Sequence, residues 1–271
     1  MFSVILPTYN RWEQLQSAVQ SVQAQTKARW ELIVVDDGST DQTQYWQPTQ
    51  SNIKIYHLNQ NQGPASARNY GIKKAKQEWI CFLDSDDLWL PDKLEQFQQF
   101  IENTKYRVFQ SQDIWFKNHQ RHYPKKKHLK QQGDIFEMAT KLCPVSMSSV
   151  CVNKEVFSNI GLFNEQYPVC EDYDFWLRVA TKYQFGLIDQ ELVILNSGHA
   201  DQVSKRDYIF DEWRLKSLVN LPKIFDLTET QNTLVNKRIL KIYQILKKGY
   251  IKYHKKPHLI ELEAKIAFLQ K

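Results

Sequence analysis

Short apolar runs alternate with segments of helical pattern over the first part of the chain. The runs that predict buried strands are "FSVIL" from Phe2, "WELIVVDD" from Trp30, "IKIYHL" from Ile53 and "WICFLD" from Trp79. Strands that are apolar at nearly every position and are separated by helices are typical of a parallel sheet covered on both faces. The polar ends of these strands should meet at one edge of the sheet, where such folds bind ligands.

Helical signals lie between and after these strands. Leu15, Val19 and Val22 recur at helical spacing, and Asn10 with Glu13 predicts a capping box at the start of that helix. Further helices are predicted over residues 63–76 and about 91–103.

The pattern changes in the second half of the chain. "YRVFQSQDIWF" and "SMSSVCVN" predict strands, with a short helix near 134–141 between them, and "CEDYDFWLRVATKY" predicts a helix. From Lys205 onwards the pattern is helical throughout. We therefore predict an α/β fold whose mixed, mostly parallel sheet is flanked by helices, with a helical C-terminal extension over residues 206–271.

Composition agrees with a folded globular protein. The chain has 271 residues, of which 42% are hydrophobic and 24% are charged. It lacks the roughly 18 consecutive apolar residues of a membrane span and the pattern of a secretory signal. Its cysteines form no C-x-x-C pair, which favours reduced thiols over a disulfide frame or a zinc site. We expect a cytoplasmic protein.

Basic residues gather at the C-terminus. Residues 232–271 hold ten Lys and Arg against two Glu, a net charge of +8, so the chain's total of +6 leaves −2 for residues 1–231. An apolar stripe of helical spacing runs among these lysines, through Val235, Ile239, Ile242, Leu246 and Tyr250. Such a helix either packs on the rest of the protein, which we favour, or lies peripherally on an anionic inner membrane face.

Carboxylates stand at the ends of two predicted strands. Asp36 and Asp37 end the second strand, and Asp84, Asp86 and Asp87 follow the fourth. Aspartate is also a common turn and cap residue, so one of them alone indicates little. Like charges that converge on one sheet edge repel each other, and a divalent cation, Mg²⁺ or Mn²⁺, would compensate them. Such an ion usually binds one or two carboxylates together with the phosphates of a substrate.

Five segments follow the order seen in one enzyme family. They are "SVILPTYNR", "ELIVVDDGSTDQT", "NQGPASARNYGI", "FLDSDDLW" and "CEDYDFWLR". On these segments the chain resembles glycosyltransferase family 2, the inverting sugar transferases with the GT-A fold, over residues 1–205. The resemblance implies a Rossmann-like GT-A domain with a nucleotide-binding half over 1–104 and an acceptor half over 105–205.

The resemblance also implies where the donor binds. In the family, the end of the first strand and the Asp of the second cradle the base and ribose. The Asp-x-Asp motif after the fourth strand approaches the ribose and the metal, and an arginine lies near the diphosphate. The residues so implied for nucleotide-sugar binding are Pro7, Thr8, Tyr9, Asn10, Asp36, Gly38, Arg68, Asp84 and Ser85.

The metal and catalytic residues follow from the same resemblance. Asp86, the second Asp of the motif, and His199 are the implied ligands of Mn²⁺ or Mg²⁺. Asp172 falls where the family places its catalytic base, with Glu171 beside it. The positive end of a helix dipole would keep such a carboxylate ionised. Acidic residues also favour helix starts in proteins where they have no catalytic role.

The implied function is metal-dependent inverting transfer of a sugar from a nucleoside-diphosphate sugar, with UDP-sugar favoured. The acceptor would be a hydroxyl of a carbohydrate or glycolipid in polysaccharide, lipopolysaccharide or glycan synthesis at the cell envelope. Trp115, Trp176 and the basic loop 117–132 could contact it, although Trp176 on an amphipathic helix is more typical of a core.

Other functions remain open on the sequence alone. One is a nucleotidyltransferase, although "LPTYNR" lacks a glycine-rich phosphate loop. A second is a protein that binds sugar nucleotides without transfer. A third is a non-catalytic protein that binds nucleic acid or membrane through its tail, but no nucleic-acid-reading motif is present and we expect no nucleic-acid partner.

Overall fold

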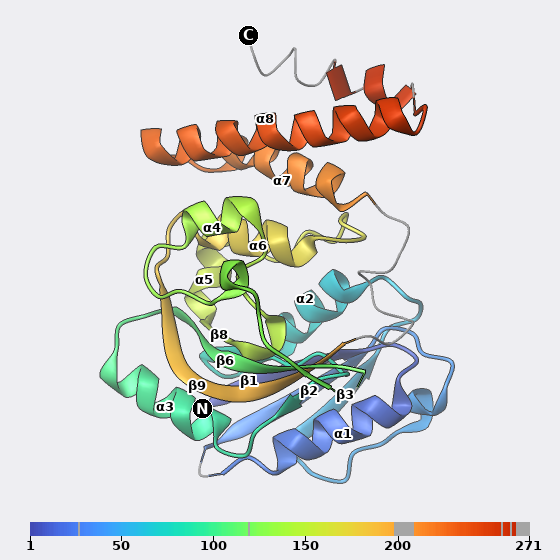
Figure 1. Cartoon of the computed structure of the whole chain (residues 1–271). Coiled ribbons are helices and arrows are strands. Elements are labelled where there is room, and N and C mark those ends of the chain that lie inside the picture. Colours follow the sequence, from blue (N-terminus) through green and yellow to red (C-terminus); the bar gives the residue numbers. More distant parts are fainter. Residues whose placement is uncertain (27, 119, 198–208, 256, 261, 264–271) are drawn as a thin grey trace.

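The computed structural model describes residues 1–26, 28–118, 120–197, 209–255, 257–260 and 262–263. Within these residues nine strands form one sheet in the order β3-β2-β1-β4-β8-β6-β9-β5, with β7 beside β6 (Figure 1). The strands are β1 (Phe2–Thr8), β2 (Trp30–Asp36), β3 (Ile53–His57), β4 (Trp79–Phe82), β5 (Leu88–Trp89), β6 (Val108–Lys117), β7 (Gln120–His122), β8 (Val150–Asn153) and β9 (Phe185–Ser197).

The sheet has two halves with different strand directions. β3, β2, β1 and β4 are parallel neighbours, as the sequence predicts. β8 is antiparallel to both β4 and β6, while β9 is parallel to β6 and antiparallel to β5. The predicted α/β fold with a mixed sheet flanked by helices is confirmed.

Helices cover both faces of the sheet (Figure 1). α1 and α3 share an apolar core with one face, and α2, α4, α5 and α6 share a second core with the other. α7 and α8 pack beyond α6 and α4 and extend this second core. The helices are α1 (Trp12–Gln23), α2 (Pro64–Lys74), α3 (Lys93–Asn103), α4 (Phe136–Lys141), α5 (Lys154–Ile160), α6 (Glu171–Val179), α7 (Phe210–Ile224) and α8 (Glu229–Lys252), with short 3₁₀ helices η1 (Gln42–Tyr45), η2 (Lys126–His128) and η3 (Met147–Ser149).

β1 lies at the centre of this arrangement. Val4 and Leu6 point into the core under α1 and α3, whereas Ile5 points into the core under α2, because successive side chains of a strand face opposite sides. α2 can approach β1 closely at Gly71, since a Cβ there would lie 2.4 Å from Cγ2 of Ile5. This close packing fixes the height of Arg68, one turn earlier on α2, above the sheet.

Two local features differ from the sequence interpretation. The expected capping box is wrong, since α1 has Arg11 at its N-cap position without a side-chain cap. Asn10 instead has a φ of +49°, and its Oδ1 accepts a hydrogen bond of 2.7 Å from Thr40 N–H, which joins the loops after β1 and β2.

β9 was not predicted from the sequence. Three exposed polar residues interrupt its apolar pattern, beside a register shift in its pairing with β6.

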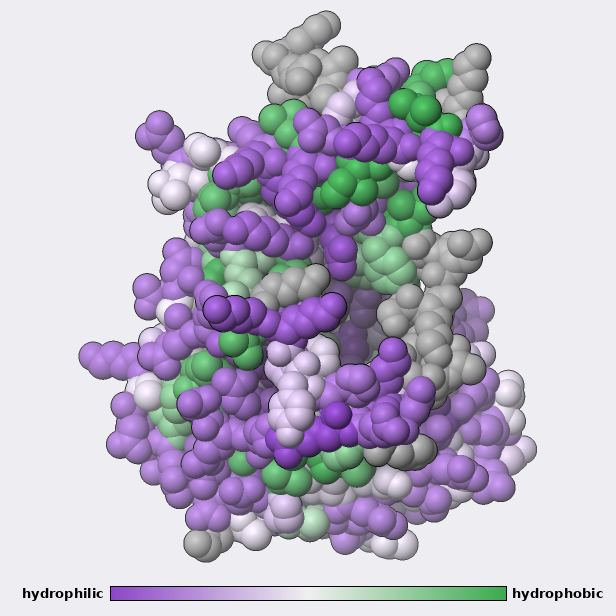
Figure 2. All heavy atoms as spheres, viewed as in Figure 1, coloured by the Kyte–Doolittle hydropathy of each residue, from purple (hydrophilic) through white to green (hydrophobic). Residues whose placement is uncertain are grey.

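The apolar stripe of α8 packs inside the protein. All five of its residues are buried, and α8 contacts α7 and α4. The favoured interpretation of a packed helix is therefore confirmed, and the stripe itself is covered. Figure 2 shows mostly hydrophilic side chains on the outer surface of this helical layer, with smaller hydrophobic patches between them.

Two further observations concern membrane spans and the predicted start of the C-terminal extension. No helix in the described part of the chain is long and apolar enough to cross a membrane. The predicted boundary between residues 205 and 206 lies outside the described residues, so the division into domains stays a prediction.

Candidate active site

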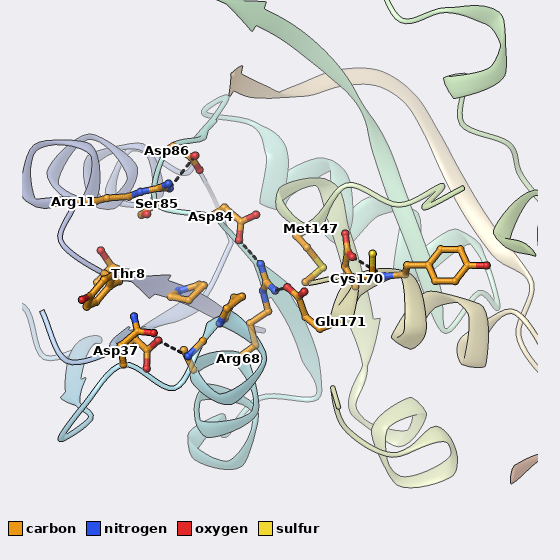
Figure 3. A pocket seen from close by; sticks show the side chains of 18 of the residues that line it. Thr8, Arg11, Asp37, Arg68, Asp84, Ser85, Asp86, Met147, Cys170 and Glu171 are labelled. Carbon is orange, nitrogen blue, oxygen red and sulfur yellow. Dashed lines mark hydrogen bonds and ion pairs between the residues drawn. The ribbon is translucent and has the colours of Figure 1, made fainter. Parts of the chain in front are cut away.

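A cavity of about 670 Å³ opens beyond the carboxyl ends of β1 and β4, between these strand ends, α2 and the start of α6 (Figure 3). Its lining side chains come from both halves of the sequence. They are Pro7, Thr8, Tyr9, Asn10, Arg11, Asp37, Asn61, Gly63, Pro64, Ala67, Arg68, Asp84, Ser85, Asp86, Cys143, Met147, Cys170, Glu171, Asp172, Tyr173, Phe210 and Arg214.

Most residues predicted for the site come together in this cavity. Those that line it are Pro7, Thr8, Tyr9, Asn10, Arg68, Asp84, Ser85, Asp86, Glu171 and Asp172. Asp36 and Gly38 do not line it, and His199 lies outside the described residues.

Asp36 and Asp37 take different positions although they are neighbours. Asp36 is 1% exposed, accepts a hydrogen bond from Ser39 N–H at 3.0 Å and lies 2.8 Å from Nδ1 of His57. Asp37 lines the cavity and accepts hydrogen bonds of 2.8 Å from the N–H groups of Gln62 and Gly63. Burial raises the pKa of Asp37, against these hydrogen bonds. The residue that faces the cavity is therefore the second of the pair, which sequence reasoning had not assigned to the site.

Gly38 shapes the loop that carries Asp37. Its φ is +77°, and a Cβ there would lie 2.7 Å from the carbonyl carbon of Gln60. A side chain at this position would meet both a strained backbone and a clash. Gly38 thus allows two loops to pack together at the edge of the cavity.

Arg68 joins the two halves of the site. Its Nη2 donates to Asp84 Oδ1 at 2.8 Å, and its Nη1 donates to Glu171 Oε1 at 2.9 Å (Figure 3). Burial lowers the pKa of Arg68, but the charges of the two carboxylates outweigh burial and the pKa is raised. Burial, with repulsion from Asp172, raises the pKa of Glu171 to about 7 despite the arginine.

The carboxylates after β4 have distinct partners. Asp86 Oδ2 lies 2.9 Å from Arg11 Nη1 at the cavity wall. Asp87 faces away from the cavity and accepts hydrogen bonds from Ser148 Oγ at 2.6 Å and Asn196 N–H at 3.0 Å. Burial raises the pKa of Asp87 well above its ordinary value. Asp87 therefore holds the loop to η3 and β9, whereas Asp86 stays at the cavity.

A turn in left-handed conformation places the acidic start of α6. Cys170 has a φ of +63°, which costs a non-glycine residue on the order of 1 kcal/mol. Such backbone strain is often found at functional sites. Asp172 then lies in the first turn of the helix, where its Oδ1 accepts from Tyr173 N–H at 2.6 Å. Burial raises the pKa of the neighbouring Cys143 thiol, and the charge of Asp172 adds to that shift.

The donor atoms of the cavity are suited to a hard divalent cation. Within the described residues, no group of three or more His, Cys, Asp or Glu is placed to hold a metal ion. Mg²⁺ and Mn²⁺ need few protein ligands, since one or two carboxylates together with phosphate oxygens and water complete the shell. Asp84 and Asp86 supply that number of carboxylates at the cavity wall, so the residues present fit such an ion.

The tryptophans predicted to contact the acceptor do not lie at the cavity, and residues of the C-terminal extension do. Trp176 is fully buried in the core, and neither it nor Trp115 lines the cavity. Phe210 and Arg214 from α7 line it instead. No sequence pattern marks these two residues, because their place depends on how α7 packs against α6.

Comparison with known proteins gives the family. The family model described as "Glycosyl transferase family 2" matches residues 3–160. An uncharacterised glycosyltransferase of Rickettsia conorii is 36% identical over 194 residues, which are 70% of this chain and 32% of that protein. The chain thus spans about a third of the length of the first curated relatives that it matches.

One relative matches along nearly the whole chain. The Escherichia coli protein WfgD, named UDP-Glc:alpha-D-GlcNAc-diphosphoundecaprenol beta-1,3-glucosyltransferase, is 28% identical over 268 residues, 96% of each chain. Among solved structures, S. aureus TarS in complex with UDP-GlcNAc has a TM-score of 0.77 and 22% identity, over 96% of this chain and 79% of that one. This likeness supports the GT-A fold.

Proposed function

The chain belongs to glycosyltransferase family 2, and we propose that it is a metal-dependent inverting enzyme that transfers a sugar from a UDP-sugar to an acceptor hydroxyl. One observation carries the proposal. The ion pairs of Arg68, at 2.8 and 2.9 Å, bring Asp84 after β4 and Glu171 at the start of α6 into one cavity. A donor site and a candidate base thus share a single space.

The donor would lie along the ends of β1 and β2. Thr8, Tyr9 and Asp37 line this side of the cavity, where open α/β sheets bind nucleotides. The names of the E. coli relative and of the S. aureus structure both contain a UDP-sugar, which supports uridine over other bases.

The diphosphate side of the donor would lie near the end of β4. Asp86, with Asp84 beside it, would hold Mg²⁺ or Mn²⁺. A bound ion of this kind supplies positive charge to a leaving diphosphate. Arg68 adds a fixed guanidinium, although Asp84 and Glu171 neutralise it in part.

Asp172 is proposed as the catalytic base. The acceptor oxygen forms a bond to the anomeric carbon, and the bond from that carbon to the diphosphate oxygen breaks with its electron pair on the diphosphate. The hydroxyl proton moves to Asp172. Glu171 is held by Arg68 at 2.9 Å, which leaves Asp172 as the carboxylate able to turn to the acceptor. Attack from the face opposite the leaving group inverts the anomeric centre.

The acceptor is proposed to be a growing glycan of the cell envelope, because the E. coli relative is named for transfer to a lipid-linked sugar. The outer face of α8 would bring the enzyme to an anionic membrane surface. Lys237, Lys241, Lys248 and Lys252 are exposed there, and basic residues near such a surface favour binding.

A thermal-shift experiment tests the donor proposal. The protein is heated with UDP, GDP, dTDP, CDP or ADP, each with Mn²⁺ or with a chelator. A ligand that binds only the folded state raises the apparent melting temperature by mass action. We expect a rise with UDP that requires Mn²⁺. If the melting temperature is the same without nucleotide and with each of the five nucleotides, the proposed donor site is rejected.

A further inference from the structure

Arg214 lines the cavity from α7, outside residues 3–160 that the family model matches. Its Nη1 lies 3.3 Å from Asp211 Oδ1, a long contact on the same helix. Its Nε is buried and has no hydrogen-bond partner within the described part of the chain. A guanidinium carries five N–H donors, so most donors of this group have no protein partner among the described residues.

Arg178, a buried arginine on α6, shows how an arginine with a structural role is hydrogen-bonded in this protein. Its Nε donates to Asp174 at 2.9 Å, and its two Nη atoms donate to the carbonyls of Ile160 at 2.9 Å and Leu162 at 2.8 Å. That side chain is a structural tie between elements. Arg214 has no comparable set of partners among the described residues, and its side chain, which is 31% exposed, is open to the cavity that it lines.

The position of Arg214 assigns it to the acceptor side. Its guanidinium lies 5.8 Å from the ring centre of Tyr173, the residue that follows Asp172. Burial raises the pKa of the Cys170 thiol, and the charge of Arg214 acts to lower that pKa. Figure 3 shows Cys170 across the cavity from Asp86. The arginines near Asp86 and Asp84, which are Arg11 and Arg68, are each held by carboxylates.

We propose that Arg214 binds a phosphate group on the acceptor, so that the accepting sugar carries a phosphate or diphosphate close to its reacting hydroxyl. The inference rests on the proposed function, because it names the substrate class of the same cavity. A guanidinium pairs with phosphate through two parallel N–H bonds, which also fixes the orientation of the ligand. Asp172 and Arg214 would then hold the two ends of one acceptor.

The test uses the full chain loaded with UDP and Mn²⁺, so that the donor side is occupied. Three probes are titrated by calorimetry: farnesyl diphosphate, glucose 1-phosphate and methyl glucoside. The variants are Arg214→Gln and Arg214→Lys, with Arg238→Gln as the matched control. Arg238 on α8 also has a buried Nε without a partner among the described residues, but it donates to the carbonyl of Lys141 and does not line the cavity. Binding of UDP by each variant reports that it is folded.

We expect the parent chain to bind at least one phosphate probe at least tenfold more tightly than methyl glucoside. Arg214→Gln should lose this preference, Arg214→Lys should keep part of it, and Arg238→Gln should keep all of it. Tighter binding of farnesyl diphosphate would identify a lipid-linked acceptor, and equal or tighter binding of glucose 1-phosphate a soluble phosphorylated glycan.

Two results would overturn the inference: no preference for phosphate in the parent chain, or the same preference in Arg214→Gln. Either result with normal UDP binding rejects only the phosphate acceptor. Failure of the parent chain to bind UDP with Mn²⁺ rejects the proposed function itself.

Discussion

The two walls of the cavity are built in different ways. On the donor wall, Asn10 and Asp37 are bonded to backbone N–H groups of neighbouring loops, at 2.7 and 2.8 Å. On the acceptor wall, Asp172 bonds the N–H of the next residue, and Arg214 has one long contact. The donor wall is thus fixed before any ligand binds, whereas the acceptor wall retains charged groups with capacity for a ligand. We therefore expect substitutions on the donor wall to weaken UDP binding, and substitutions on the acceptor wall to lower turnover.

Replacing Asp172 on the acceptor wall should give the largest effect. Asp172→Asn cannot accept the acceptor proton, so we expect turnover to fall at least about a hundredfold while UDP still binds. UDP release during transfer and UDP binding by calorimetry measure the two properties. Asp174→Asn is the matched control, because Asp174 is tied to Arg178 and its loss should lower the melting temperature more than the turnover of folded enzyme. Near-normal turnover in Asp172→Asn would shift the role of base to Glu171.

Replacing Asp86 on the donor wall should affect binding instead. We expect Asp86→Ala to reduce the affinity for UDP in Mn²⁺ at least about tenfold, because one of the few carboxylate ligands is lost. In a chelator the variant and the parent chain should bind UDP alike. Asp189→Ala, at an exposed position, serves as the control. If Mn²⁺ strengthens UDP binding equally in all three proteins, Asp86 is not a metal ligand.

The contrast between the donor wall and the acceptor wall also explains which parts of the site could be predicted from the sequence. β1, β2 and β4 are largely buried on both faces, so they appear as continuous apolar runs, and the polar residues after them mark the donor wall directly. Asp36 and Asp37 could not be told apart, because the direction of each side chain depends on the turn that follows β2. The carboxylates at the start of α6 were found through the family motif.

The acceptor wall depends on contacts between distant segments. Arg214 reaches the cavity only because α7 packs across the start of α6, and its surrounding sequence has no distinctive pattern. β9 escaped prediction because polar residues interrupt its apolar pattern. Trp176 is the opposite case to Arg214. It was a candidate for stacking on a sugar, but it is fully buried in the core.

Glu171, where the two walls meet, should give stability a measurable pH dependence. Its pKa is about 7 in the folded protein against an ordinary value of 4.5, so the folded state holds this proton more strongly than the unfolded state. Its stabilising contribution is complete below pH 4.5 and is lost as pH rises through 7. The melting temperature of the parent chain should therefore fall by a few degrees relative to Glu171→Gln between pH 5 and pH 8. A constant difference across that range would contradict the raised pKa.

The smallest effect is expected on the outer face of α8, far from both walls. Its inner stripe is buried, so only the exposed lysines are available to an anionic surface. Lys248→Gln should weaken binding to vesicles of anionic lipid by about fivefold at low salt, since one basic residue contributes about 1 kcal/mol. Flotation of the protein with such vesicles measures this, and Lys54→Gln, an exposed lysine on β3, is the matched control. Turnover with a water-soluble acceptor should not change, because Lys248 does not line the cavity. Equal flotation of Lys248→Gln and the parent chain would mean that α8 does not bring this enzyme to the membrane.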